Sequence, residues 1–386
     1  MAIRLKGLTW DHPRATSPLY AAAEPLRRLR PDIDLSWDVQ PLAGFEASPI
    51  AEAARGYDLI IFDHPHIGEV AKQALFRPAD AVLKIETLND EDFIGPSLAS
   101  YRYGGHVWGL PLDAACQVSC VRPDLLAELG AAQPTSWSET LEFGELIQQH
   151  GFRLGMAYAG VHSLMTLLSL CANQSAPLAS GDCSRAFADR SAARKALAAM
   201  KALLAFCARE VLDWNSIGVQ EAMCARDDLV FCPAVYGFAP YAHCGRRRRL
   251  VYGNFAGLVA GGAGSTIGGA GLGVSAFSNK PDIAFAVARF LIDARVQTNT
   301  IARHDGQPAR SEAWSSSQVN QASGGFYQDT RVTMERAWVR PRFDGYLHFQ
   351  RAGGELVEAY LRGSTSMEST LDRLEAAWTA ARSHAR

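Results

Sequence analysis

Several features that would place a protein in a specialised class are missing from this chain of 386 residues. No stretch approaches the ~20 uninterrupted apolar residues of a membrane-spanning helix, and the apolar segment 255–277 is interrupted by many glycines. A formal net charge of −2 provides no general attraction for nucleic acid. The one dense basic patch, residues 246–249, could bind phosphates or lipid headgroups, or it could form a solvated loop. We favour the solvated loop. We expect a soluble protein with no nucleic-acid partner and no membrane insertion.

Cysteine patterns typical of disulfide scaffolds and zinc sites are also lacking. The eight cysteines are sparse and without the paired short spacings of a zinc site. Several, such as Cys171 and Cys207, lie in apolar helical runs, where cysteine packs as a small hydrophobic residue. Free thiols, and a first strand at residues 3–10 where an export signal would stand, predict a cytoplasmic protein. A chain trimmed of its signal would instead be periplasmic.

The composition is that of a globular protein with two cores. Hydrophobic residues make up 48% of the chain and charged residues 20%. Strand patterns at residues 3–10, 33–39 and 57–62 alternate with helical patterns at 19–29 and 50–55, which predicts a mostly parallel sheet. Ligands of such sheets gather beyond the carboxyl ends of the strands, and these ends carry the polar segments 11–14 and 63–66.

A second α/β region is expected after a tight hairpin at Gly104 and Gly105. Helices are predicted at 123–129, 161–171, 192–207 and 217–225, with another, capped by Thr135 or Ser136, that runs to residue 150. A strand is predicted at 229–232. The Gly-rich segment 256–270 is interpreted as a connector, followed by a strand at 272–277, a helix at 281–294 and a last helix at 366–382 with Ser366 as its N-cap.

The order of five segments resembles the solute-binding proteins of ABC importers, in the family that includes the maltose-binding and glycerol-phosphate-binding proteins. The segments are residues 104–111 (G-x-x-W/Y-G-L-P in the family), 121–126 with 134–137, 268–278 with 281–291, 306–310 (G-x-x-P-A-R), and 340–342 with 371–378. This resemblance implies a two-lobed α/β fold of the type II periplasmic-binding-protein kind, with three hinge crossings and a cleft between the lobes. The expected lobes are residues 1–110 plus 255–308, and 111–254 plus 309–386.

The implied function is capture of a small polar, saccharide-like ligand by closure of the two lobes. The resemblance further implies an ABC transporter permease as a partner, a monomer, and no cofactor. It places ligand contacts at Trp10, Asp11, His12, Arg14, Asp63, His64, Asp113, Cys116, Gln117, Tyr236, Tyr241, Asn254, Gly269 and Arg310. Aromatic faces that stack on sugars, and Asp, Arg and Asn side chains that bind hydroxyls, suit this role.

Structural roles remain open for the same residues. Asp11 and Asp63 follow strands, where aspartate also caps helices. Trp10 and the two tyrosines also suit core or hinge packing. His12, His64 and His66 with these carboxylates form a weak pattern for a metal site, and we expect none.

An alternative function follows from Cys116. Cys116 resembles thiaminase I, an enzyme on the same fold, in its position, since that enzyme carries its nucleophilic cysteine at the corresponding place. The segment matching its activating glutamate, residues 236–241, holds no carboxylate here, which leaves His243 or His162 as the base. We expect a buried, inert Cys116 and a non-enzymatic protein. An intracellular sensor that reports ligand binding to a partner is a third hypothesis with the same site.

Overall fold

The computed structural model describes residues 2–42, 49–83, 88–177, 187, 189–245, 247–261 and 264–384. The chain forms two compact units. Unit 1 consists of Met1–Ala115, Gly268–Ala322 and Arg342–Leu347, and unit 2 of Cys116–Ile267, Ser323–Pro341 and His348–Arg386. Cys183 and Arg246, both part of the patterns discussed above, lie outside the described residues.

This division differs from the expected one at the inner boundaries and near the C-terminus. Residues 111–115 belong to unit 1 and residues 255–267 to unit 2, the reverse of the expectation. Residues 309–322 and 342–347 belong to unit 1, although the sequence suggested that everything after 308 belongs to the second lobe. A backbone bridge between Phe93 and Arg310 and a hydrogen bond from the Ile94 N–H to the Ala309 carbonyl hold the first of these segments in unit 1. Because such pairings join residues more than 200 positions apart, periodicity along the chain does not reveal them.

Unit 1 is built on a mixed sheet whose first strands form as predicted. Strand β1 pairs in parallel with β2 and β3, and β10 runs antiparallel to β3. All four residues of β3 are buried, as expected for a strand covered on both faces. The hairpin glycines Gly104 and Gly105 have φ of 57° and 83°, the left-handed conformation that this turn requires. The strands are β1 Ile3–Trp10, β2 Ile33–Gln40, β3 Leu59–Phe62, β4 Arg102–Tyr103, β5 His106–Val107 and β10 Ile267–Val274.

The helices of unit 1 begin close to the strand ends. Helix α1 starts at Pro13, several residues before the predicted start, because proline fits the first helical turn and His12 caps it. Its buried face includes Leu19, Ala22 and Leu26. The helices are α1 Pro13–Leu29, α3 Ile50–Gly56, α4 Ile67–Lys72, α10 Pro281–Leu291, α11 Ala294–Val296, α12 Ser311–Ser315 and α13 Ser317–Ala322.

The prediction of a connector through residue 270 is wrong for its last residues. Strand β10 begins at Ile267, and its glycines let the backbone lie directly against bulky rings. A Cβ on Gly271 would lie 2.4 Å from the ring of Tyr101, and one on Gly273 would lie 2.4 Å from the ring of Phe76. The glycines therefore serve close packing in the sheet.

Unit 2 surrounds the second half of strand β6, Leu110–Val121, which begins in unit 1. Strand β8, Leu229–Tyr236, pairs antiparallel with β6 on one side, and β9, Val251–Gly253, pairs antiparallel on the other. The short strand β7, Arg153–Leu154, continues the sheet in parallel with β8. Strand β8 is longer than predicted and carries Tyr236 at its end.

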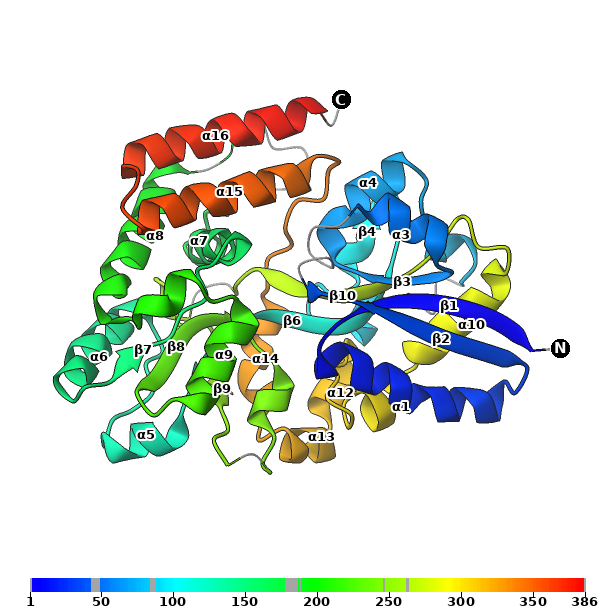
Figure 1. Cartoon of the computed structure of the whole chain (residues 1–386), viewed down its shortest axis with the longest axis horizontal. Helices are drawn as coiled ribbons and strands as arrows, with labels where there is room; N and C mark the ends of the chain where they lie inside the picture. The colour runs from blue at the N-terminus through cyan, green and yellow to red at the C-terminus, as the bar shows by residue number, and fades with distance from the viewer. Residues whose placement is uncertain are drawn as a thin grey trace. The chain divides into compact units, whose positions relative to one another are not determined.

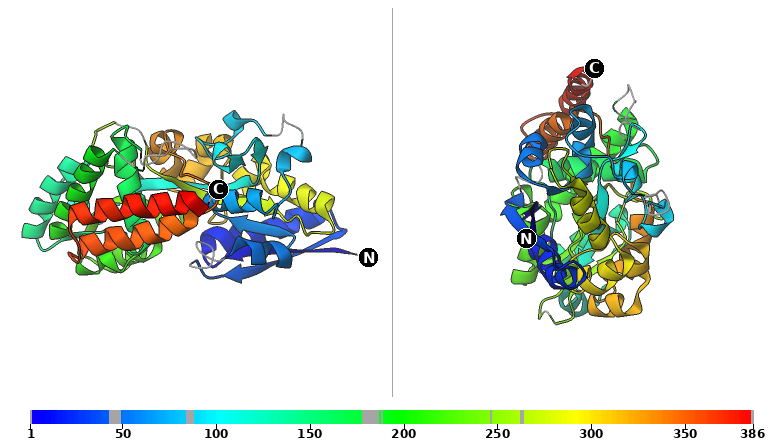
Figure 2. Two further views of the ribbon diagram at one scale, coloured as in Figure 1. Left: turned by 90° about the horizontal axis from the view of Figure 1, so that it is seen from above. Right: turned by 90° about the vertical axis from the view of Figure 1, so that its right-hand side faces the viewer.

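The helices of unit 2 begin where the caps in the sequence place them. The Ser136 and Ser366 hydroxyls accept backbone hydrogen bonds from the third residue beyond each. Helix α7 is buried along almost its whole length and packs against α8. Helices α15 and α16 lie side by side in Figures 1 and 2, joined by an edge-on contact of Phe349 with Trp378. The helices are α5 Pro123–Glu128, α6 Trp137–Gln149, α7 Val161–Asn173, α8 Arg190–Leu203, α9 Ser216–Ala225, α14 Phe326–Glu335, α15 Tyr346–Leu361 and α16 Met367–His384.

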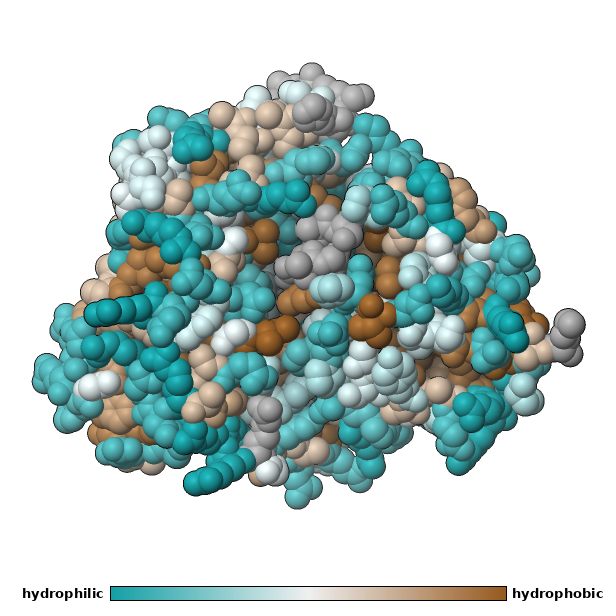
Figure 3. Space-filling model, in the orientation of Figure 1, coloured by the Kyte–Doolittle hydropathy of each residue, from teal (hydrophilic) through white to brown (hydrophobic). Residues whose placement is uncertain are grey.

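The face of the molecule drawn in Figure 3 is mainly hydrophilic. On the face in Figure 3, polar and charged residues dominate and hydrophobic ones form scattered patches. Large exposed apolar side chains, such as Leu29, Leu146 and Val332, occur on separate elements. Among the described residues, no helix is both long and apolar enough to cross a membrane.

Candidate functional site

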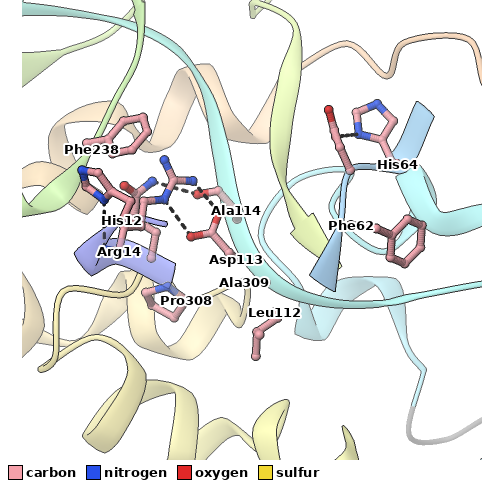
Figure 4. A network of polar contacts seen from close by, with 12 residues as sticks. His12, Arg14, Phe62, His64, Leu112, Asp113, Ala114, Phe238, Pro308 and Ala309 are labelled. Atoms are coloured by element: carbon pink, nitrogen blue, oxygen red, sulfur yellow. Dashed lines mark hydrogen bonds and ion pairs between the residues drawn. The ribbon is translucent and has the colours of Figure 1, made fainter. Parts of the chain in front are cut away.

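The end of β1 and the start of α1 bring three of the predicted ligand residues together in unit 1. The His12 ring stacks on Trp10, with centroids 5.6 Å apart, and its Nδ1 accepts a hydrogen bond from the Arg14 N–H at 3.0 Å. Arg14 turns toward Asp113 on β6 (Figure 4). Its Nε donates to Asp113 Oδ2 at 2.8 Å, and its Nη2 pairs with Oδ1. We call His12, Arg14 and Asp113 the unit 1 cluster.

Burial makes the ion pair of this cluster energetically important. The Arg14 side chain is 4% exposed and the Asp113 side chain 13% exposed. Two parallel hydrogen bonds compensate for the loss of solvation of both charges. Gly269, with φ of +96°, passes beside Asp113, where an added Cβ would lie 2.4 Å from its carbonyl oxygen. Close approach of β10 therefore shapes this cluster, and only glycine fits there.

The small cavity beneath the unit 1 cluster is too small for a sugar. Its volume is about 20 Å³, and Thr9, Arg14, Asp113 and Gln307 help to line it. That is room for roughly one water molecule. The Thr9 hydroxyl is buried and has no hydrogen-bond partner among the residues that the structure describes. This cavity is therefore a structural feature of the β1–α1 junction.

The end of β3 carries a second group of predicted residues. Asp63 Oδ1 lies 3.0 Å from Nδ1 of the fully buried His64, as the dashed line in Figure 4 shows. The Asp63 side chain makes no capping hydrogen bond to the short helix that follows. Asp11 is exposed and does not cap α1, since His12 does so. The capping interpretation is thus wrong for both aspartates.

Arg310 is held by its own unit. Its Nε donates to the Ile292 carbonyl at 2.7 Å, Nη1 lies 3.3 Å from Asp92 Oδ2, and the guanidinium lies 4.2 Å from the ring centroid of Phe93. Burial lowers the pKa of Arg310, and the nearby Asp92 partly offsets this shift. These contacts join α10 to the segment before the hairpin, and a ligand role for Arg310 stays a prediction.

In unit 2, Gln117 and Tyr236 belong to one polar network. They are direct partners on β6 and β8. Gln117 Oε1 accepts from the Ser169 hydroxyl at 2.6 Å, and Ser169 lies 2.9 Å from the Thr266 hydroxyl. The Tyr236 and Thr266 hydroxyls are hydrogen-bonded at 3.0 Å. Gln117 is buried and Tyr236 half-buried, so the tyrosine is the accessible end of this unit 2 network.

Sequence reasoning missed the helix α7 part of the unit 2 network. Thr166 accepts a hydrogen bond from Gln117 Nε2 at 3.2 Å, beside Ser169. A signal was present, because Ser163, Thr166, Ser169 and Asn173 recur at three- and four-residue steps on a helix whose other residues, apart from His162, are apolar. Such a stripe on a buried helix requires polar partners.

Cys116 has the properties of a core residue. It is 3% exposed, and burial raises its pKa to about 12, while a hydrogen bond with Ser265 acts in the opposite direction. The thiol is therefore protonated near neutral pH. The proposed base His162 bonds through Nδ1 to Ser216 at 3.2 Å, and burial followed by the charge of Arg340 lowers its pKa to about 4.

The last two predicted residues lie at other places in unit 2. Tyr241 is buried, and its hydroxyl donates to Glu221 Oε1 at 2.6 Å. Asn254 Oδ1 accepts from both the backbone N–H and the hydroxyl of Thr333, at 3.0 and 2.8 Å. Asn254 also lines a polar cleft of about 650 Å³ within unit 2, a size typical of small-ligand pockets. We call this the β9–α14 cleft; Ser119, Gln133, Asn254, Gln328, Asp329 and Arg336 line it.

Metal ligands do not converge in the part of the chain that the structure describes. No group of three or more His, Cys, Asp and Glu side chains there is arranged to hold a metal ion. His12 caps α1 and His64 follows β3, and the Nδ1 atom of each ring is already engaged as described.

Comparison with known proteins shows the fold. No protein-family model and no curated protein matches the chain. A solute-binding protein of an ABC transporter from Thermotoga lettingae, bound with α-D-tagatose, matches with a TM-score of 0.82, 16% identity, and coverage of 98% of this chain and 100% of that one. Maltose-bound MalE3 from T. maritima matches with a TM-score of 0.81 and 16% identity, over 97% of this chain and 98% of that one. A solute-binding protein from Agrobacterium radiobacter in complex with ribitol matches with a TM-score of 0.79 and 16% identity, over 98% of this chain and 98% of that one. The predicted α/β class and two-lobed fold are confirmed.

Proposed function

We propose that this protein is a solute-binding protein that captures a small polar ligand of the sugar or polyol class. The observation that carries the proposal is the fold match over 97–98% of the chain to binding proteins with tagatose, maltose and ribitol. The match covers both units, so no additional domain has to be explained. The chain contributes hydroxyl, amide and charged groups of the kind that bind sugar hydroxyls.

The two polar groups of residues support this ligand class on chemical grounds. The unit 1 cluster combines a guanidinium and a carboxylate that orient each other with the His12 ring, which stacks on Trp10. The unit 2 network ends in the Tyr236 hydroxyl. Donors and acceptors held by their own partners lose little conformational entropy when they bind hydroxyls. We propose that the Tyr236 hydroxyl, the accessible end of the unit 2 network, contacts the ligand.

A thermal-shift screen over sugars, polyols, amines and amino acids tests the proposal. A ligand at about 100 times its dissociation constant adds about 2.7 kcal/mol to the free energy of unfolding. We expect sugars or polyols to raise the melting temperature and the amines and amino acids to leave it unchanged. A library in which no sugar or polyol stabilises the protein would contradict the proposed function.

Two matched variants then locate the site. Tyr236→Phe removes one hydroxyl from the unit 2 network, and we expect about a fivefold loss of affinity, equivalent to about 1 kcal/mol for one hydrogen bond. Asp329→Asn alters the β9–α14 cleft, whose lining does not include Tyr236. Isothermal titration of the ligand found in the screen should show unchanged affinity for Asp329→Asn. The opposite result would move the site to that cleft.

The proposal includes delivery of the ligand to an ABC transporter permease by a monomeric binding protein. Light scattering should give the mass of one 41.8 kDa chain with and without ligand. The enzymatic alternative lacks a specific observation in its favour, because the Cys116 thiol is buried and its pKa is raised to about 12.

A further inference from the structure

Four cysteines that are scattered along the sequence gather in unit 2, three of them buried and Cys224 half-buried. Cys120 on β6 and Cys232 on β8 are direct partners across the antiparallel sheet, and both are fully buried. Cys224, near the end of α9, interacts electrostatically with Cys120, and Cys207 does so with Cys232. Neither the ligand-binding groups nor the fold match explains this concentration of thiols.

The register of the two strands brings the first pair within disulfide distance. The Arg122 N–H donates to the Val230 carbonyl at 2.8 Å, so Cys120 and Cys232, two residues along each strand, occupy the same kind of hydrogen-bonded position. Opposite residues at such positions have Cα atoms roughly 5.5 Å apart, which lies within the usual range for disulfides. Their side chains project from the same face of the sheet. A register shift lies next to this pair, between Val118 and Cys120.

We propose that Cys120 and Cys232 are a disulfide modification site, which forms a cross-strand disulfide when the chain folds in the presence of a small-molecule disulfide. The thiolate of one cysteine attacks the small disulfide, forms a mixed disulfide and releases one thiolate. The second cysteine thiolate then attacks the protein sulfur and releases the other. In total, the two protein thiols lose two electrons and two protons, and the small disulfide is reduced to two thiols.

Burial determines when this reaction takes place. In the folded protein, burial and then the neighbouring Cys232 raise the pKa of Cys120 well above its usual value. Thiolate is the reactive form, so folding protects the Cys120 sulfur, and the fully buried Cys232 side chain is out of reach of reagents in solvent. The disulfide therefore forms during folding, before β6 and β8 close over it. It records whether the chain folded in an oxidising or a reducing environment.

The link is expected to stabilise unit 2 considerably. It closes a loop of roughly 110 residues and so restricts the unfolded chain, and an increase in melting temperature of ~5 °C or more follows unless the link strains the native sheet. The same loop contains the helices α5 to α9, so the link connects the two strands between which these helices of unit 2 lie in the chain.

Oxidative refolding of the whole protein tests the proposal. The reduced chain is unfolded in urea and diluted into a glutathione redox buffer, or into the same buffer with excess reductant. Peptides from non-reducing digestion are then identified by mass spectrometry. We expect a peptide pair linked through Cys120 and Cys232 after oxidation only, with native circular dichroism and a raised melting temperature.

Single alanine variants provide the controls, since alanine preserves a small apolar side chain at each position. Cys120→Ala and Cys232→Ala should each abolish the linked peptide and the rise in melting temperature. Cys224→Ala and Cys207→Ala should keep both, as should Cys171→Ala on α7. Absence of the 120–232 link in wild type, a dominant link between Cys120 and Cys224, or a linked protein that melts no higher than the reduced one would overturn the proposal.

Discussion

Replacing Arg14 by methionine tests the contribution of the unit 1 cluster to stability. The replacement leaves the Asp113 carboxylate, 13% exposed, without the two hydrogen bonds that it receives from Arg14. Removal of one partner from a buried ion pair costs about 3–5 kcal/mol. We expect the lower part of this range, about 3 kcal/mol, because Asp113 retains some contact with solvent.

The double variant Arg14→Met with Asp113→Leu separates the pair from its parts. With both charges removed, no buried charge remains without a partner, and replacement of a buried pair by apolar residues is often neutral or stabilising. We expect the free energy of unfolding of the double variant to be about 2–3 kcal/mol higher than the value obtained by adding the losses of the two single variants. Urea unfolding followed by tryptophan fluorescence measures all four proteins, and Trp10 beside His12 is a reporter close to the change.

The same helix provides the control. Arg28 pairs with Glu24 at 2.7 Å, but these side chains are 77% and 57% exposed. Such a pair contributes about 0.5 kcal/mol or less and weakens in salt. Arg28→Met should therefore be nearly neutral, and the cost of Arg14→Met should change little between low and high salt. Equal effects of the two substitutions, or additive effects in the double variant, would refute the assignment of Arg14 to a buried pair.

Three further predictions concern single residues. At pH 8 roughly one in 10⁴ Cys116 thiols is ionised, given its pKa of about 12. Iodoacetamide should therefore alkylate the exposed Cys244 at least 100 times faster than Cys116. Rapid labelling of Cys116 would revive the enzymatic alternative. Because burial lowers the pKa of His162 to about 4, only the unfolded chain gains this proton as pH falls from 6.5 to 4, and stability should fall by about 3 kcal/mol over that range. His162→Gln should flatten this part of the urea-measured pH profile, and an unchanged slope would contradict the assignment. Gly269→Ala should lower the free energy of unfolding, measured by thermal unfolding, by about 2 kcal/mol or more. The added Cβ would lie 2.4 Å from the Asp113 carbonyl oxygen, and the φ of this residue is +96°. A neutral result would contradict this close packing.

Local chemistry in the sequence determined the succession of elements. Alternating strands and helices, the caps Ser136 and Ser366, and the Gly104–Gly105 turn depend on interactions between residues a few positions apart. The motif order correctly indicated the two-lobed fold for the same reason, since short motifs mark turns and strand ends. The polar stripe on α7 was equally visible in the sequence, although its partner Gln117 was not.

Only the tertiary structure decided which distant residues meet. Arg14 and Asp113 are separated by 99 positions, and Cys120 pairs with Cys232 through a strand register that no local signal specifies. The glycines of β10 indicated a connector in sequence, yet they allow the strand to pack against Tyr101 and Phe76. Local propensity describes neighbours along the chain, whereas burial, ion pairing and close backbone approach depend on the side chains that folding brings from elsewhere.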